Sequence, residues 1–141
     1  MTRYAESSAV LAWLLGEPRG GPVAALLAAA DLVVTSELTL VEVDRAVHRA
    51  MATGAMDPVT AHRLRERLGE TATEWAIEPM SGAVIDRARR SFPHDAIRAP
   101  DAIHLATAVV VASSVGDLDV LSLDERVRSN AVGLGFRVLP D

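Results

Sequence analysis

Hydrophobic positions along the chain follow two alternating patterns. Short apolar runs rich in Val, Leu and Ile are typical of buried parallel strands, and longer stretches with apolar residues at helical spacing are typical of helices. The short runs predict strands at Arg3–Ala5, Leu32–Thr35, Trp75–Ile77, Val120–Ser122 and Arg137–Leu139. The longer stretches predict helices at Ser8–Leu15, Gly21–Ala30, Leu38–Met51, Pro58–Leu68, Met80–Ser91, Asp101–Ser113 and Asp124–Val132.

Strands separated by helices predict an α/β fold, with a central parallel sheet of about five strands and helices on both faces. No linker, repeat or low-complexity stretch divides the 141 residues, so we expect residues 1–141 to form a single domain. Ligands of such sheets bind beyond the carboxyl ends of the strands. Polar residues that follow the predicted strands are therefore the first candidates for a functional site.

Four carboxylates occupy such positions. Glu6 directly follows the first predicted strand, and Asp124 directly follows the fourth. Glu42 lies about one turn into the helix after the second strand, and Asp101 begins the most apolar helix. Carboxylates crowded at one edge repel one another unless a cation neutralises them, and Mg²⁺ or Mn²⁺ prefers oxygen ligands. Because such ions activate water against phosphate esters, the pattern favours metal-dependent phosphodiester hydrolysis.

Each acid also has a purely structural interpretation. Asp101 could face the dipole of its own helix, and Asp124 could cap the last helix. Glu6 could be an acid in the first turn of a helix, whereas Glu42 has apolar neighbours and favours a functional role. The hypothesis of one acidic site depends on the pattern as a whole and not on any single member.

Composition narrows the chemistry that the chain can perform. It has no cysteine, which excludes disulfides, thiolate catalysis and cysteine-based zinc sites. All basic residues are arginine, so no lysine can form a Schiff base. The net charge of −5 argues mildly against a nucleic-acid partner, but less so if the acids are gathered at one site. We expect a cytoplasmic protein without a membrane partner, since the sequence shows neither a membrane-spanning run nor a signal peptide.

The segments that carry the acids resemble the PIN-domain family, and in particular the VapC-type toxins of bacterial toxin–antitoxin pairs. The resemblance lies in Tyr4–Val10, Thr35–Val43, Arg98–Ala108, Val120–Val127 and Gly133–Pro140, in the family's order and spacing. It implies an endoribonuclease dependent on Mg²⁺ or Mn²⁺, with Glu6, Glu42, Asp101 and Asp124 as catalytic residues and metal ligands. It also implies a homodimer held inactive by a cognate antitoxin, whose helix would lie in an apolar groove and place a basic side chain in the acidic site.

Two departures from the family pattern bear on activity. Glu6 stands where the family has an aspartate, and its extra methylene allows metal ligation only if the backbone or the ion shifts. Ser122 stands where the family has a threonine and keeps the hydroxyl. Ser8 matches a family serine that supports the first acid, and Arg126 is our first candidate for a phosphate contact.

The replacement at Glu6 leaves a second hypothesis open, a catalytically weakened PIN-like module that binds RNA or a protein. A third class, a Mg²⁺-dependent phosphatase or phosphoryl acceptor, is less favoured, because it needs a nucleophilic aspartate after the first strand. His104, one turn after Asp101, could be a metal ligand or proton shuttle, but we favour a buried, hydrogen-bonded histidine. Asp119 is interpreted as a loop or cap residue before the fourth strand, outside the site.

Overall fold

The five predicted strands form one parallel sheet. They span Thr2–Ala5 (β1), Leu32–Ser36 (β2), Ala76–Glu78 (β3), Leu118–Leu121 (β4) and Arg137–Leu139 (β5) in a computed structural model that describes residues 1–141. Their order across the sheet is β3-β2-β1-β4-β5, and each neighbouring pair runs parallel. The predicted α/β architecture is confirmed, with strand boundaries within two residues of those expected.

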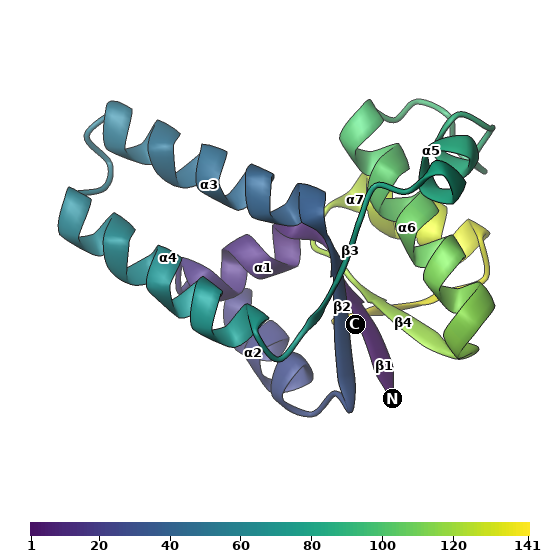
Figure 1. Cartoon of the computed structure of the whole chain (residues 1–141), viewed down its shortest axis with the longest axis horizontal. Coiled ribbons are helices and arrows are strands. Elements are labelled where there is room, and N and C mark those ends of the chain that lie inside the picture. Colours follow the sequence, from purple (N-terminus) through teal and green to yellow (C-terminus); the bar gives the residue numbers. More distant parts are fainter.

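Seven helices cover both faces of this sheet. They are α1 (Ser7–Leu14), α2 (Gly20–Ala28), α3 (Glu37–Ala52), α4 (Pro58–Ala72), α5 (Gly82–Ala88), α6 (Ala99–Val115) and α7 (Glu125–Gly133). Helices α1 to α4 lie on one side of the strands and α5 to α7 on the other (Figure 1). No helix is both long and apolar enough to cross a lipid bilayer.

Burial of the strands on both faces explains their nearly continuous apolar sequence. Tyr4 and Val34 point toward Leu105 of α6 on one face. The next residue along β1, Ala5, and the preceding residue along β2, Val33, pack with residues of α1 and α3 on the other face. Successive strand residues therefore serve opposite layers, as the two-residue period of a strand requires.

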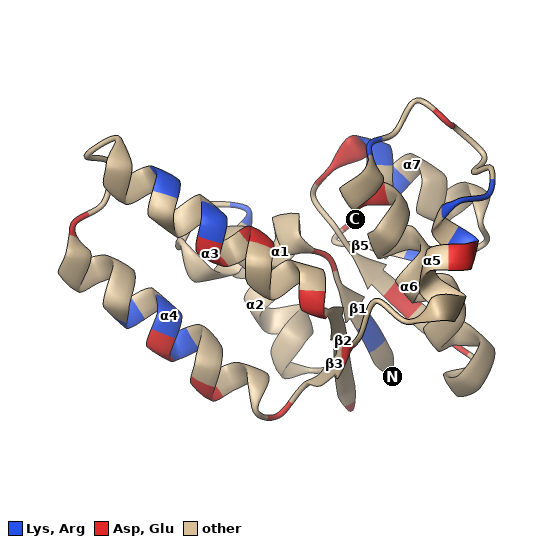
Figure 2. Ribbon diagram, turned by 45° about the horizontal axis from the view of Figure 1, so that its top comes forward, with Lys and Arg blue, Asp and Glu red and all other residues tan.

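Helices α3 and α4 form a long hairpin beside the sheet. Acidic and arginine residues are interspersed along both helices (Figure 2). Arg65 of α4 donates from Nε and Nη2 to the two carboxylate oxygens of Asp44 on α3, at 3.0 and 3.3 Å. The hairpin is thus joined by a bidentate ion pair on its solvent side and by apolar packing beneath it.

The central strand β1 sets the place of the candidate site. The chain passes from β1 to β2 in one direction across the sheet and reaches β4 on the opposite side of β1. Ala5 pairs with Leu121 in the parallel register, and the Glu6 amide donates to the Leu121 carbonyl at 2.9 Å. Residues that follow β1 and β4 therefore leave the sheet side by side, at the point where a doubly wound sheet forms its ligand crevice.

The interpretation of Asp119 was partly wrong. It lies within β4 and is buried, in register with Arg3 of β1, although it is outside the acidic site as expected. Its Oδ2 atom is 3.8 Å from Arg3 Nε, and Arg3 also donates from Nη1 to the Leu26 carbonyl. A charged partner on the neighbouring strand explains how an aspartate is tolerated inside a buried strand.

Candidate metal centre

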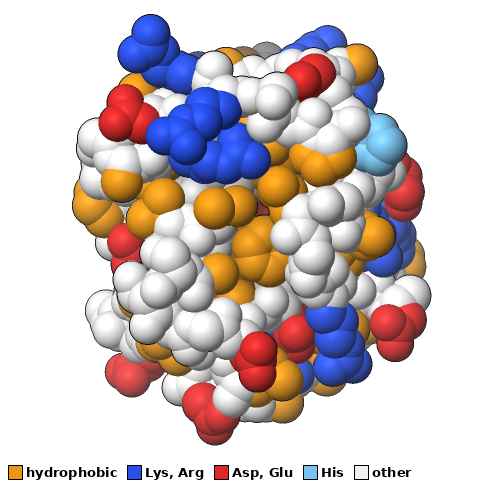
Figure 3. Space-filling view, turned by 90° about the vertical axis from the view of Figure 1, so that its right-hand side faces the viewer, with side chains coloured by type: hydrophobic (Ala, Val, Ile, Leu, Met, Phe, Trp, Pro, Cys, Tyr) orange, Lys and Arg blue, Asp and Glu red, His pale blue; other side chains and the backbone are white.

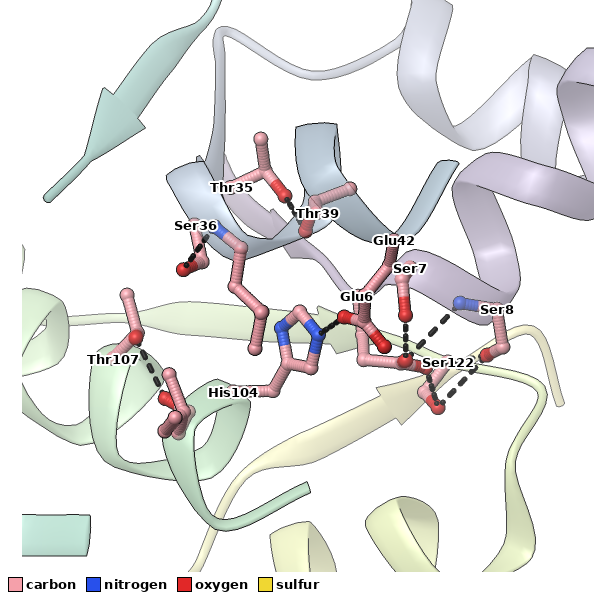
Figure 4. A network of polar contacts seen from close by, with 12 residues as sticks. Glu6, Ser7, Ser8, Thr35, Ser36, Thr39, Glu42, His104, Thr107 and Ser122 are labelled. Carbon is pink, nitrogen blue, oxygen red and sulfur yellow. Dashed lines mark hydrogen bonds and ion pairs between the residues drawn. The ribbon is translucent and has the colours of Figure 1, made fainter. Parts of the chain in front are cut away.

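Glu6 is the most heavily hydrogen-bonded of the four acids. It caps α1 and is 4% exposed. Its Oε1 atom accepts from the Ser7 hydroxyl at 2.7 Å and the Ser8 amide at 3.0 Å, and its Oε2 atom accepts from the hydroxyls of Ser8 and, at 2.7 Å, Ser122 (Figure 4). Both oxygens of the Glu6 carboxylate are therefore engaged by donors of the protein itself.

The hydroxyls of Ser8 and Ser122 extend this hydrogen-bond network from Glu6 to the backbone that follows β4. The Ser8 hydroxyl accepts from the Leu123 amide at 2.8 Å, and the Ser122 hydroxyl accepts from the Asp124 amide at 3.1 Å. The two serines therefore link Glu6 to the backbone that carries Asp124. This geometry supports the auxiliary role expected for both serines, which stays a prediction.

Asp124 and Asp101 lie at the beginnings of two helices. Asp124 caps α7, and its Oδ1 atom accepts from the amides of Arg126 and Val127 at 2.9 and 3.3 Å. Asp101 lies in the first turn of α6, where its Oδ2 atom accepts from the Arg98 amide at 3.4 Å. In each case the second carboxylate oxygen has no donor from the protein.

The Asp101 carboxyl lies within the electrostatic influence of two of the other acids. Burial raises the pKa of its carboxyl, and the negative charges of Asp124 and Glu6 raise it further, against the lowering by the Arg98 amide and His104. Such mutual repulsion is what a bound cation relieves.

Glu42 approaches the same edge from the other layer of the structure. Its Oε1 atom lies 2.5 Å from His104 Nε2, and His104 Nδ1 lies 2.7 Å from the Tyr4 hydroxyl. The structure confirms that His104 is a buried, hydrogen-bonded histidine, since its side chain is 1% exposed and both ring nitrogens have partners. Tyr4 and Ser7 are the members of this network that the sequence analysis did not single out. The tyrosine of the first motif was the available signal.

The donor set matches the chemistry of a hard divalent cation, since all four acids offer carboxylate oxygens. Glu42, Asp101 and Asp124 each retain one oxygen without a protein donor, whereas Glu6 does not. No three Asp, Glu or His side chains lie close enough together to hold a metal ion as they stand. The four acids therefore do not form a metal-binding cluster in this structure, and their role as metal ligands stays a prediction.

Arg126 lies two residues beyond Asp124, and its guanidinium has no acidic partner. It lines a hollow of about 400 Å³ with His94, Ile97, Ser129 and neighbouring residues, between α7 and the segment that leads into α6. Basic side chains also gather at the top of the face shown in Figure 3, the end toward which the strands run.

Comparison with known proteins identifies the family of this fold. The order of the strands defines an α/β domain with a parallel five-stranded sheet. Residues 4–132 match the PIN domain family, and the chain belongs to that family. The resemblance inferred from the four motifs is thereby confirmed. No curated protein matches the sequence.

Three solved structures share the fold at low sequence identity. FitAcB from Neisseria gonorrhoeae has a TM-score of 0.72 at 20% identity, covering 98% of this chain and 96% of that one. VapBC2 from Rickettsia felis, bound to a DNA fragment from its promoter, has a TM-score of 0.64 at 9% identity, covering 99% and 98%. VapC20 from Mycobacterium tuberculosis, a toxin that cleaves the sarcin–ricin loop, has a TM-score of 0.62 at 16% identity, covering 90% and 93%.

Proposed function

We propose that this protein is a metal-dependent endoribonuclease that hydrolyses phosphodiester bonds of RNA in the cytoplasm with Mg²⁺ or Mn²⁺. The observation that carries the proposal is the placement of Glu6, Glu42, Asp101 and Asp124 near the carboxyl edge of a PIN-domain sheet. Three of these carboxylates keep an oxygen free, and the pKa of Asp101 is raised first by burial and then by the negative charges of Asp124 and Glu6. Membership of the PIN family supports the same conclusion.

Glu42, Asp101 and Asp124 would hold the cation through their free oxygens. Glu6, the fourth acid of the set, would join them only by releasing hydroxyl groups of Ser8 or Ser122. A divalent ion bound here would supply an activated water and stabilise the charge that develops on the leaving oxygen. The four acids would thus serve both as metal ligands and as catalytic residues, with Glu6 as the weakest ligand.

Arg126 is proposed to bind a phosphate of the substrate. It lies two residues after Asp124, lines a surface hollow and forms no ion pair, and an arginine fork matches the geometry of a phosphate group. Ser8 and Ser122 would act indirectly, by holding Glu6 and the backbone before Asp124 in place.

We also propose that the chain is the toxin of a toxin–antitoxin pair and forms a homodimer. The shared fold with VapBC2 and with the toxin VapC20 supports this. Val41, which precedes Glu42 on α3, is 55% exposed and would give an antitoxin helix an apolar contact beside the acidic site. Failure of the chain to co-purify with the small protein encoded next to it would count against this partner.

RNA cleavage by the purified chain, freed of any antitoxin, tests the proposed function. The wild type, Asp101→Asn and the exposed control Asp86→Asn are incubated with several structured RNAs, with Mn²⁺, with Mg²⁺ and with a chelator. We expect cleavage by the wild type and the control that requires the metal and is lost in Asp101→Asn. No cleavage by folded protein, together with no Mn²⁺ binding, would favour the non-catalytic binding module instead.

A further inference from the structure

A buried imidazole connects Glu42 to the central strand. His104 of α6 contacts Tyr4 of β1 through Nδ1 and Glu42 of α3 through Nε2, at 2.7 and 2.5 Å (the latter contact is drawn in Figure 4). Tyr4 and His104 are each 1% exposed. The chain of contacts thus joins one strand and two helices that pack on opposite faces of the sheet.

The two partners of His104 set the tautomer of its imidazole. A carboxylate oxygen only accepts hydrogen bonds, so His104 Nε2 donates to Oε1 of Glu42. A neutral imidazole with its proton on Nε2 accepts at Nδ1, and the Tyr4 hydroxyl is the donor within reach of that atom.

Glu42 depends on this bond more than the other acids depend on any single contact. Glu6, Asp101 and Asp124 accept from backbone amides at the beginnings of helices, whereas Glu42 lies within α3 and its only hydrogen-bond partner is His104. A glutamate side chain that is 29% exposed would otherwise move between rotamers. The bond holds Oε1 and leaves Oε2 free.

We propose that Tyr4 and His104 are positioning residues that hold the Glu42 carboxylate toward the cation of the acidic site. The inference rests on the proposed function, because it assumes that Glu42 is a metal ligand. In other proteins, mutation of a residue that orients a metal ligand typically lowers metal affinity about 10- to 100-fold.

Two amide replacements of His104 separate positioning from packing. An asparagine amide reaches roughly the place of Nδ1, so His104→Asn keeps a group near Tyr4 and loses the donor to Glu42. A glutamine amide reaches roughly the place of Nε2, so His104→Gln keeps a donor near Glu42. Tyr4→Phe removes only the hydroxyl that sets the tautomer, and His62→Asn changes an exposed histidine on α4 as a control.

Mn²⁺ titration calorimetry of the full chain and urea unfolding of the metal-free protein provide the two readouts. We expect His104→Asn to weaken Mn²⁺ binding about tenfold or more, with a clearly smaller loss in His104→Gln and Tyr4→Phe and none in His62→Asn. The two His104 variants should lose similar amounts of stability. Wild-type Mn²⁺ affinity in His104→Asn, or equal weakening in both His104 variants, would overturn the proposal.

The tautomer of His104 is measured separately by nitrogen NMR of the imidazole. A neutral ring protonated on Nε2 in the wild type, with mixed tautomers in Tyr4→Phe, is the expected result. A ring protonated on Nδ1 would overturn the proposal whatever the metal data show. If the wild type binds no Mn²⁺ and cleaves no RNA, the proposed function fails and the positioning role fails with it. If the wild type binds Mn²⁺ and His104→Asn binds it as tightly, the positioning role alone fails.

Discussion

At the scale of single residues, the structural and functional interpretations of the acids are compatible. Glu6 and Asp124 cap helices, and Asp101 accepts from a backbone amide in the first turn of α6. A carboxylate has two oxygens, so a cap bond to one oxygen can leave the other for a cation. Asp101 and Asp124 keep such an oxygen, whereas the serines occupy both oxygens of Glu6.

Replacing Asp101 by Asn should stabilise the metal-free protein at neutral pH. The pKa of Asp101 is raised in the folded state, so the native protein binds more protons than the unfolded chain, and stability falls as pH rises from the unfolded pKa of about 3.9 through the folded pKa. Asn removes this penalty and can still accept from the Arg98 amide. Solvent screens the half-buried group, so we expect a gain below about 1 kcal/mol.

Urea unfolding of wild type and Asp101→Asn at pH 7 and pH 3.5 checks this expectation. The gain should be present at pH 7 and shrink at pH 3.5, where the aspartate is protonated in the unfolded chain as well. With Mn²⁺ present, the wild type should gain more stability than the variant, because a ligand stabilises the state that binds it. A variant less stable than wild type at pH 7 without metal would contradict the assignment.

Shortening Glu6 to Asp should release part of the serine network. The shorter side chain cannot keep every hydroxyl contact, including the one to Ser122 just after β4, so we expect stability to fall by about 1 kcal/mol. The released carboxylate oxygen should tighten Mn²⁺ binding several-fold. Urea unfolding and Mn²⁺ titration measure the two effects, with the exposed Glu17→Asp as control. Weaker Mn²⁺ binding would show that the glutamate is already a working ligand.

At the scale of elements, the close approach of α1 and α2 depends on one glycine. A Cβ atom at Gly20 would lie 2.1 Å from the carbonyl oxygen of Ala12, whereas one at Gly21 would meet nothing within 4 Å. The backbone of α1 cannot move aside as a flexible side chain could. We therefore expect Gly20→Ala to destabilise the protein by about 2 kcal/mol or more, and Gly21→Ala to stabilise it by about 0.5–1 kcal/mol.

Urea unfolding of these two variants gives a matched comparison, because both add one methyl group to the first turn of the same helix. Equal stability of the two would mean that α1 and α2 do not approach as closely as the structure has them.

The pair of Arg3 and Asp119 joins β1 and β4 at the end of the sheet opposite the acids. Removing one partner leaves a buried charge, so Asp119→Ala should lower the free energy of unfolding by about 3 kcal/mol. Replacing both residues by apolar ones, Arg3→Met with Asp119→Leu, should recover most of that loss. Denaturant unfolding of Arg3→Met, Asp119→Leu and the double variant measures the coupling. Additive losses would contradict a direct interaction.

At the scale of the whole molecule, both layers share one sheet, so we expect residues 1–141 to unfold as one unit. The tryptophans Trp13 and Trp75 lie in the layer of α1 to α4, with ring centroids 6.0 Å apart. Their fluorescence therefore reports one face, whereas far-ultraviolet circular dichroism reports every helix. The two urea curves should coincide. Separate midpoints would show that the layers unfold independently.

The sequence by itself determined the order and type of the elements. Apolar runs and helical spacing identified all five strands and seven helices, because both faces of the sheet are buried and the periods of strand and helix differ. It also predicted the four acids as one site, because parallel strands bring their carboxyl ends to one edge wherever they lie in the chain, and that prediction awaits the metal and cleavage experiments. The family followed from motifs whose order could be read directly.

Only the tertiary structure decided how each acid is held. That Glu6 meets Ser122 depends on the register between β1 and β4, and that His104 joins Tyr4 to Glu42 depends on how α3 and α6 pack from opposite faces. Asp119 likewise proved to be a strand residue, and only the register of β4 with β1 places Arg3 beside it. These contacts join residues about 60 to 120 positions apart, and no local pattern encodes which buried polar groups will become partners.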